Sequence, residues 1–561
     1  MNEHVKSYKK ETITGQYDVI MIGSGLGGMS AAAFLAKEGK RVLILESHYE
    51  PGGFTHTFKR KGYEWDVGVH YVGEVHRPYS MISKLFNYIN DTPVEWTEMG
   101  DVYDKMIFGK EIYDYKTGEE DFKKQMKSYF PDPADQEAID KYVEAIKTAQ
   151  KSQQLFFIEK TLNARLSSLF GNFMRKGAMK YNRPTLDVLH EITKNKKLIA
   201  VLTGQYGDYG SPPSEGSFLM HAMLVKHYFN GGCYPVGGSK SIFNAIAPTI
   251  LKAGGEIFTR AKVRQILVND QHAAYGVQLE DGLEVLAPIV ISSAGIYNTY
   301  KNLLAPEVAN HFKLHAQLAK IKRSTGHMCL YIGLKYKKSE LNLGKANYWV
   351  FPDNYDHDEN IQKFVGDPKN DFPIAYISFP AAKAADWEER FPDRSTIEIV
   401  TVAPYEWFQK WEEERWKKRG EEYEQIKEDF SQRLLEKLYA QEPQLRGKVD
   451  CYELSTPLST KHFCNYEFGE VYGLDNGVER FNQKFLRPRT PIKNLYLTGQ
   501  DVVSVGIGGA LSSGLLTATV VMGKNLMTRL FDSKFQFYMG FFKGLIGIKS
   551  EHTRPTTNPA P

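Results

Sequence analysis

The sequence predicts an α/β protein in which the main domain is assembled from separate stretches of chain and a second, α+β domain is inserted between them. The chain has 561 residues, which is too many for one hydrophobic core. Residues 17–46 have the pattern of strand, glycine-rich turn, helix and strand that is typical of a parallel sheet. Far downstream, residues 491–518 again show a strand, a glycine-rich turn and a helix.

Composition indicates a globular protein and argues against a dedicated nucleic-acid binder. Apolar residues make up 42% and charged residues 25%, and 71 Lys plus Arg against 67 Asp plus Glu leave a net charge of only +4. The four cysteines include no C-x-x-C pair, which argues against a metal centre or a disulfide framework and fits a reducing compartment. Residues 1–16 lack the apolar core of a signal peptide, and no run of about 18 apolar residues predicts a membrane-spanning helix.

The first element of the main domain is a β-α-β unit. Residues 17–22 (YDVIMI) form a short apolar run, which predicts a buried first strand. The alanine-rich stretch Met29–Glu38 predicts a helix that ends at Gly39. Residues 41–45 (RVLIL) predict the second strand. The N-terminal N–H groups of the helix would then face bound phosphates.

Three glycines and an acid give this unit a binding function. Gly23, Gly25 and Gly28 form G-x-G-x-x-G, which permits a tight turn, close approach to a pyrophosphate and close packing of helix on strand. Glu46 stands at the end of the second strand, where its carboxylate can accept hydrogen bonds from ribose hydroxyls. The complete order of elements predicts a dinucleotide site, although this motif alone fits NAD and FAD equally.

The residues after Glu46 favour FAD. Gly52 and Gly53 stand where flavin enzymes of the glutathione-reductase and amine-oxidase type carry a glycine pair beside the pyrophosphate, and residues 62–68 match their spacing G-x-x-x-D-x-G. Those enzymes usually have an arginine directly after the pair. Phe54 occupies that position here, so one phosphate contact is either missing or replaced, with Lys59 and Arg60 as the candidates.

The downstream segment predicts a second cofactor contact. Residues 494–497 read as a strand, Gly499 and Asp501 belong to the turn at its end, and Gly508 lies in the first turn of a helix that runs to about residue 521. Asp501 would then lie near the phosphate and ribitol, with the helix N-terminus aimed at the anionic edge of the flavin. The alternative is a buried glycine-rich turn and helix without a ligand.

A third segment, from 232 to 305, completes the predicted FAD-binding domain. It contains a helix over 239–253 and strands near 256–258, 263–269 and 288–292, with the backbone of Val263 presented to the adenine. The predicted FAD-binding domain comprises residues 1–95, 232–305 and 485–528, the substrate and membrane-associating domain comprises 96–231 and 306–484, and 529–561 form an amphipathic C-terminal tail. Because no second G-x-G-x-x-G lies outside the cofactor segments, an external electron donor is favoured over direct reduction by NAD(P)H.

The chain resembles the retinol saturases (all-trans-retinol 13,14-reductases), within the wider group of phytoene desaturases and carotenoid isomerases. The resemblance implies a discontinuous Rossmann-like FAD-binding domain and a membrane-associated enzyme that acts on a conjugated polyene. Saturases reduce one double bond, whereas relatives desaturate or isomerise carotenoids, so the shared fold does not fix the reaction. The resemblance rests on DVGVHYVGEV (66–75), GDYGSPPSEGSF (207–218), HAMLVKHYFNGGCYPVGG (221–238), VISSAGIYNTYKNLL (290–304), FPAAKAADWEERFPDRST (379–396), APYEWFQKWEEE (403–414) and RTPIKNLYLTGQD (489–501).

Reduction of a double bond needs a proton donor, and three residues are candidates. His70 and Tyr71 follow the glycine pair and would pass near the flavin ring, where His70 could donate a proton near neutral pH and Tyr71 could hold or relay one. Asp208 belongs to a second polar cluster in GQYGDYG. The alternative for His70 is a structural histidine that only shapes the cavity wall.

Two stretches suggest contact with a membrane surface, on the cytoplasmic face. Residues 155–180 and 531–549 mix aromatic and aliphatic residues with lysine or arginine, a composition that suits interfacial helices through which a lipophilic substrate could enter. The alternative is that both pack against the protein itself. A non-enzymatic alternative for the whole chain is a prenyl-binding module like the Rab escort proteins and GDP-dissociation inhibitors, which keep this two-domain fold without a flavin.

Overall fold

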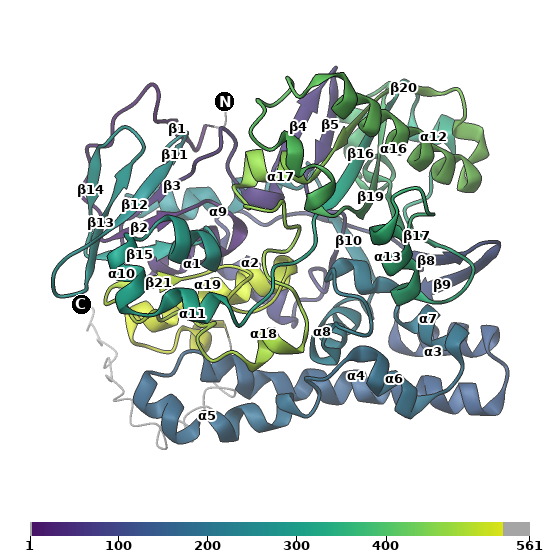
Figure 1. Ribbon diagram of the computed structural model, residues 1–561, viewed down its shortest axis with the longest axis horizontal. Coiled ribbons are helices and arrows are strands. Elements are labelled where there is room, and N and C mark those ends of the chain that lie inside the picture. Colours follow the sequence, from purple (N-terminus) through teal and green to yellow (C-terminus); the bar gives the residue numbers. More distant parts are fainter. Residues whose placement is uncertain (1–2, 531–561) are drawn as a thin grey trace, which may run out of the picture.

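A parallel six-stranded sheet forms the centre of the first half of the molecule. The structure is a computed structural model that describes residues 3–530 (Figure 1). The sheet has the order β1-β11-β3-β2-β15-β21, and every neighbouring pair is parallel. All four residues of β2 and of β3 are buried, as expected for strands covered on both faces. The strands are β1 (Lys6–Ser7), β11 (Glu256–Thr259), β3 (Val42–Leu45), β2 (Val19–Ile22), β15 (Ile289–Ser292) and β21 (Leu495–Leu497).

Helices cover one face of this sheet and a small antiparallel sheet covers the other. The helices are α1 (Leu26–Lys37), α9 (Lys240–Lys252) and α19 (Gly506–Met522), and α1 packs on both of the others. The opposite face carries β12 (Val263–Val268), β13 (Ala274–Leu279) and β14 (Glu284–Leu286). This three-layer arrangement places the glycine-rich loop before α1 and the loop before α19 at the same edge of the sheet.

The second half of the molecule is built on a mixed seven-stranded sheet, seen at the upper right of Figure 1. Its order is β20-β16-β19-β18-β17-β8-β9, in which β8 and β17 are parallel and the remaining neighbours antiparallel. Alternate side chains point to opposite faces, so the two faces belong to two hydrophobic cores. The strands are β20 (Val449–Ser455), β16 (His327–Leu334), β19 (Ser395–Val402), β18 (Ala375–Ser378), β17 (Asn347–Phe351), β8 (Val102–Phe108) and β9 (Glu111–Lys116).

Different helices pack on the two faces. Helix α16 (Gly420–Gln441) contributes Phe430, Leu434 and Leu438 to one core, and α4 (Pro133–Glu159) and α8 (Phe218–Tyr228) contribute to the other. Helices α4 and α5 (Ala164–Met179) run along the lower edge of the view in Figure 1. The other helices are α2 (Met81–Ile89), α3 (Glu119–Tyr129), α6 (Thr185–Ile192), α7 (Lys196–Leu202), α10 (Pro306–His311), α11 (Leu314–Leu318), α12 (Lys338–Leu341), α13 (His357–Gly366), α14 (Pro380–Lys383), α15 (Trp387–Arg390), α17 (Pro457–Cys464) and α18 (Val478–Asn482).

Two short sheets connect the halves. One has the order β6-β10-β7, formed by β6 (Val72–Gly73), β10 (Gly232–Pro235) and β7 (Trp96–Glu98). The other is the hairpin of β4 (Thr57–Arg60) and β5 (Tyr63–Asp66), which follows the glycine pair. Strand β5 packs on β19, and the indole of Trp65 donates a 3.0 Å hydrogen bond to the carbonyl of Ile332 in β16. The chain therefore passes directly from the nucleotide-binding loops to the second sheet.

The structure describes only one of the two stretches with a membrane-surface composition. Residues 155–180 are not one helix, because α4 ends at Glu159 and the side chain of Asn163 caps the N-terminus of α5. Within α5, the side chains of Leu169 and Phe173 are 67% and 73% exposed. The stretch 531–549 lies outside the described residues. Among residues 3–530, no helix is both long enough and apolar enough to cross a bilayer.

Candidate functional site

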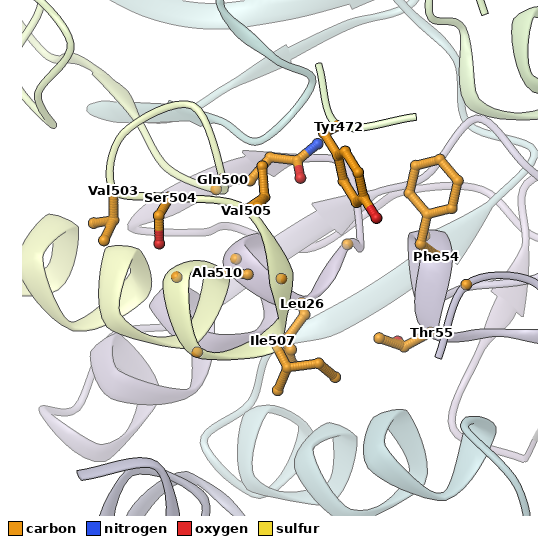
Figure 2. Close-up of a pocket in the computed structure, with 18 of the residues that line it drawn as sticks. Leu26, Phe54, Thr55, Tyr472, Gln500, Val503, Ser504, Val505, Ile507 and Ala510 are labelled. Carbon is orange, nitrogen blue, oxygen red and sulfur yellow. The ribbon is translucent and has the colours of Figure 1, made fainter. Parts of the chain in front are cut away.

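A single continuous cavity of about 1410 Å³ extends from the glycine-rich loops of the first half to the wall formed by the second sheet. Its volume exceeds the roughly 300–1,000 Å³ of ordinary small-molecule pockets, so it has room for a large cofactor together with a substrate. Figure 2 shows side chains from three distant segments around it, including Leu26 in α1, Phe54 and Tyr472. Most of the lining surface is apolar.

The nucleotide end of the cavity is formed by the loop before α1. Gly23, Gly25 and Glu46 all line it. One oxygen of the Glu46 carboxylate accepts hydrogen bonds from the backbone N–H (2.9 Å) and the hydroxyl (2.7 Å) of Ser24, and the other accepts from the N–H of His48 (2.8 Å). Glu46 therefore fixes the shape of the loop as well as reaching the cavity.

The glycine pair meets this loop directly. Gly52 and Gly53 have φ values of +112° and +57°, and a Cβ on Gly53 would lie 2.9 Å from the Cα of Gly25. A side chain at Gly53 would separate the two loops, and the positive φ at both positions favours glycine. Phe54 follows on the cavity wall, whereas Lys59 lies 3.5 Å from the carboxylate of Glu64, and residues 59–60 do not line the cavity. They are therefore not in place to replace the arginine that other flavin enzymes carry.

The N-terminus of α19 forms the third side. Gly499, Gly506 and Gly508 line the cavity, and the backbone N–H groups of the first helical turn have no partner within the helix. Val263, at the start of β12, also lines the cavity. These positions suit the backbone contacts that the sequence predicted at the adenine and at the flavin.

Two of the predicted cofactor residues lie outside the cavity wall. A Cβ on Gly28 would lie 2.5 Å from the carbonyl oxygen of Gly23, so Gly28 lets α1 pack closely on the loop. The carboxylate of Asp501 is turned inward, where it accepts a 2.8 Å hydrogen bond from the N–H of Ile296 and lines a separate space of about 10 Å³ beside Gly473. The oxygen that accepts this bond connects the turn after β21 to the segment that carries Ile296, while the other oxygen of Asp501 is buried without a hydrogen-bond partner in the described residues. The predicted contact of Asp501 with the cofactor therefore stays a prediction.

His70 lies on the cavity wall but is not a charged acid. Burial, reinforced by the nearby Lys383 ammonium, lowers the pKa of His70 to about 3, so the imidazole is neutral at pH 7. The role of His70 as a proton donor stays a prediction, and the lowered pKa disfavours its imidazolium form. Its Nδ1 lies 3.0 Å from Oε2 of Glu398, a close contact without hydrogen-bond alignment.

Tyr71 and Asp208 form a hydrogen-bonded pair that reaches the cavity. The hydroxyl of Tyr71 lies 2.8 Å from Oδ2 of Asp208 and 3.0 Å from Oδ2 of Asp104. A phenol has one proton and can donate to only one carboxyl group, so the other carboxyl must carry a proton and donate to the phenol oxygen. Burial raises the pKa of Asp104 as well, but Asn347 and Gln205 donate hydrogen bonds of 2.9 and 2.8 Å to it and oppose that rise. Asp104 is therefore the more readily ionised carboxyl of the two.

Asp208 is thus the group that holds the extra proton. Burial and the charge of Asp104 raise the pKa of Asp208 to about 8. Its partial exposure is to the cavity, which it lines. The ring of Tyr71 is held by stacking on Tyr228, with ring centroids 4.1 Å apart and planes 9° from parallel. The site therefore presents a proton-loaded Tyr71–Asp208 pair to an apolar space.

Comparisons with known proteins agree with this geometry. The family model described as "Flavin containing amine oxidoreductase" matches residues 26–522. The chain belongs to this family. It is 36% identical to the all-trans-retinol 13,14-reductase of Danio rerio over 92% of this chain and 87% of that protein. The solved structure of cyclohexylamine oxidase from Brevibacterium oxydans has the same fold, with a TM-score of 0.55, 15% identity, and coverage of 91% of this chain and 99% of that one.

These findings confirm the predicted fold class, the resemblance to retinol saturases and the assignment of the chain as a flavin oxidoreductase like the all-trans-retinol 13,14-reductases. A prolycopene isomerase of an Oncidium hybrid cultivar is more distant, at 25% identity over 91% of this chain and 85% of that protein. An "inactive all-trans-retinol 13,14-reductase" of Danio rerio is 32% identical over 93% of this chain and 88% of that protein. Because a relative named as inactive is 32% identical, overall similarity does not establish catalytic activity. Evidence for activity must come from individual residues of the site.

The residues of this family member fit a bound flavin dinucleotide. Gly25 has no protein atom within 4 Å of the place where its Cβ would stand, which leaves space directly in front of the N–H groups of the loop. The ring nitrogen Nε2 of His48, on the same wall, is buried without a hydrogen-bond partner. The apolar Phe54, Val505 and Ile507 line the same cavity around Leu26 (Figure 2).

Sequence reasoning missed four buried polar residues behind this wall. They are Asp104, Asn347, Lys383 and Glu398, each no more than 1% exposed. Asp104 and Glu398 are the only carboxylates in two β-prone runs, VYDKMIF and STIEIVTV, and a lone carboxylate in such a run is the signal that could have identified them. Asn347 and Lys383 give no comparable signal in the sequence.

Proposed function

We propose that this protein uses FAD to reduce one carbon–carbon double bond of a conjugated polyene, with all-trans-retinol as the first substrate to test. The observation that carries the proposal is the Tyr71 hydroxyl between two carboxyl groups, one of which must be protonated, at the wall of a large apolar cavity. The names of the relatives support the substrate class, and the lack of a second nucleotide motif in the sequence supports an external electron donor.

The chain supplies the proton half of the reaction. When bound and reduced, FAD supplies the hydride. As the new C–H bond forms at one carbon of the double bond, the O–H of Tyr71 turns from Asp104 to the other carbon and protonates it, and the carboxyl of Asp208 returns a proton to the phenol oxygen. Asp104 stays ionised and accepts the phenol O–H again once Tyr71 is reprotonated. Asp208 then regains its proton from water. One hydride and one proton account for the two hydrogens that are added to the double bond.

The test is an anaerobic incubation of the purified, FAD-loaded protein with all-trans-retinol and dithionite. We expect a yellow protein and a product two hydrogens heavier than retinol, lacking one conjugated double bond. Unchanged retinoids and carotenoids under these conditions would refute the substrate class. A product of unchanged mass would indicate isomerisation, and a product lighter by two hydrogens, formed by the oxidised protein, would indicate desaturation.

The proton pair predicts a pH dependence. The competent form has Asp208 protonated, so the rate of polyene reduction should be constant at low pH and fall as pH rises through about 8. In Asp208→Asn the amide cannot return a proton, and we expect a rate at least tenfold lower that no longer declines at that pH. Single-turnover rates of pre-reduced protein between pH 6 and 10 measure both. A wild-type rate that stays flat up to pH 10 would rule out Asp208 as the proton source.

We also propose that α5 contacts a membrane surface. Its exposed face combines Leu169, Phe170 and Phe173 with basic residues at 165, 176 and 180, whereas Met174 on the same helix lines the cavity. One helix thus connects the outer surface with the cavity, which suits entry of a lipophilic substrate.

The membrane proposal predicts weaker vesicle binding when this face is made acidic. Phe173→Glu should lower co-sedimentation with vesicles containing phosphatidylserine several-fold, because it removes apolar area and adds a charge that anionic lipids repel. Leu286→Glu in β14 is the matched control, since Leu286 is 59% exposed on a different surface. Equal loss in both variants would indicate general charge repulsion and contradict a specific role for α5.

A further inference from the structure

The second sheet presents a small group of polar side chains to a cavity whose lining is mostly apolar. His327 begins β16 and Tyr376 lies in β18, and both line the cavity together with His70. His327 and Tyr376 are only 9% and 5% exposed, so protein encloses both side chains almost completely. We call these three residues the polar patch.

The polar patch has buried atoms without hydrogen-bond partners among residues 3–530. The hydroxyl of Tyr376 and the Nδ1 atom of His327 are two of them. The Nδ1 atom of His70 is a third, because its close contact with Glu398 lacks hydrogen-bond alignment. Most buried polar atoms in folded proteins have a partner, and leaving one without a partner costs free energy. Three such residues on one cavity wall point to a ligand that completes their hydrogen bonds.

The three side chains share one side of the second sheet. The ring centroids of His70 and Tyr376 are 5.0 Å apart, with the ring planes at 67°. Tyr376 lies opposite Val400 in the sheet, and Val400 lies opposite Cys329. His327 is two residues before Cys329 in the same strand, so its side chain points to the same face. Val400 and Cys329 also line the cavity, which identifies this face as the cavity wall.

The chemistry of the polar patch suits an uncharged hydroxyl group. Burial lowers the pKa of His70 to about 3 and that of His327 to about 4, so both imidazoles are neutral at pH 7. A neutral imidazole has one N–H donor and one acceptor nitrogen, and the hydroxyl of Tyr376 can donate or accept. An alcohol also donates and accepts, so one alcohol group can complete hydrogen bonds with two members of the patch. A pure hydrocarbon would leave all of them without partners.

The polar patch lies beside the proposed proton donor. The ring centroids of Tyr376 and Tyr71 are 6.5 Å apart. His327 and Tyr376 belong to the second sheet, whereas the loops that suit the dinucleotide precede α1 and α19 in the first half of the molecule. This location favours the substrate over the cofactor as the source of the hydroxyl group.

We propose that the polar patch of His70, His327 and Tyr376 binds a hydroxyl group of the substrate, so that the cavity selects a polyene alcohol over a polyene hydrocarbon. That the ligand is a polyene rests on the proposed function, whereas its hydroxyl group and the residues that recognise it are inferred from the patch. FAD carries ribityl hydroxyl groups of the same chemistry, and measuring FAD affinity separates the two sources.

The test is a binding titration of the oxidised, FAD-loaded protein with two probes. One probe is all-trans-retinol, and the other is its hydrocarbon analogue, in which a methyl group replaces the CH2OH end. Quenching of tryptophan fluorescence reports binding, since Trp349 lines the cavity and its ring centroid is 4.4 Å from that of Tyr376. The measured quantity is the ratio of the retinol affinity to the analogue affinity, because the greater hydrophobicity of the analogue is the same for every variant.

Removing the hydrogen-bonding atoms should lower this ratio. We expect a several-fold fall in Tyr376→Phe and in His327→Leu, and a fall of at least about tenfold in the double variant. The atoms removed have no partner in the free protein, so Tyr376→Phe should unfold at the wild-type temperature or above it. Should His327→Leu fail to fold, Tyr376→Phe decides alone. A ratio that stays at the wild-type value in these variants would overturn the inference.

The matched control is Tyr206→Phe. The hydroxyl of Tyr206 is also buried without a partner in the described residues and its residue lines the cavity, but its ring packs against Phe351 and His357. The control should keep the wild-type ratio, and a fall as large as in Tyr376→Phe would contradict a specific role for the patch.

Two further readings separate the inference from its neighbours. Tyr376→Phe should bind FAD as tightly as the wild type; weaker FAD binding with an unchanged ratio would assign the patch to the ribityl chain and overturn the inference. Failure of the wild type to reduce retinol would refute only the proposed function, because the titration needs no turnover.

Discussion

Replacing Tyr71 with phenylalanine is expected to lower the rate of polyene reduction by about 10²- to 10⁴-fold, the usual contribution of a general acid. The change deletes the only atom of this ring that contacts the two carboxyl groups, and it leaves the stack on Tyr228 intact. The measurement is single-turnover loss of retinol absorbance in pre-reduced protein. The oxidised variant should still bind FAD, because Tyr71 is not in the glycine-rich loops.

The matched control for this prediction is Tyr228→Phe. Tyr228 also lines the cavity and stacks on the same ring, but its hydroxyl bonds neither of the two carboxyl groups; it donates to the carbonyl of Tyr71, at 3.5 Å. The control should keep the rate within a few-fold of the wild type. In Tyr71→Phe the carboxyl of Asp208 also loses the hydroxyl that it contacts. We therefore expect the free energy of unfolding of Tyr71→Phe to be lower by about 1–3 kcal/mol. A Tyr71→Phe rate equal to that of the control would exclude the hydroxyl as the proton donor.

The nucleotide-binding loop and the polar groups behind the cavity differ in how far local sequence determines them. The loop around Gly23 and Gly25 and the acid Glu46 lie within one β-α-β unit, so apolar runs and glycine spacing are enough to place them. Even there the predicted helix start at Met29 was three residues late, since α1 begins at Leu26. Gly27 and Gly28 lie in the first turn of α1. Because glycine has a low helix propensity, the sequence pattern does not predict this turn as helical.

The polar groups behind the cavity depend on contacts between distant segments. Glu398 meets His70 and the N–H of Asp66, which is 332 residues away in sequence, only because β5 packs on β19. Asp104 meets Tyr71 across a shorter separation of 33 residues, but Tyr71 again lies outside the sheet that contains its partner. No local pattern determines such pairs. The same limit applies to Asp501: its place at the end of β21 could be predicted, but the direction of its carboxylate is decided by Ile296 and Gly473.

The largest effect on the cofactor is expected from Gly25→Val. Gly25 has ordinary backbone angles (φ −57°, ψ 160°), and no protein atom lies within 4 Å of a Cβ built there, so the side chain fits the folded protein. It would, however, fill the space in which the pyrophosphate approaches the N–H groups of the loop. Loss of two charge-assisted hydrogen bonds, at about 1.5–3 kcal/mol each, predicts an affinity for FAD at least about 100-fold lower.

Titration of the deflavinated protein with FAD, followed by flavin fluorescence, measures this affinity, and far-UV circular dichroism verifies the fold. Gly344→Val is the matched control, because a Cβ at Gly344 is equally free of neighbours but points to solvent outside the cavity. Gly25→Ala should fall between the wild type and Gly25→Val, since one methyl group fills less of the same space. A folded Gly25→Val protein that binds FAD as tightly as Gly344→Val would show that the dinucleotide does not lie over this loop, and the assignment of Gly23, Glu46 and the glycine pair to the cofactor would fail with it.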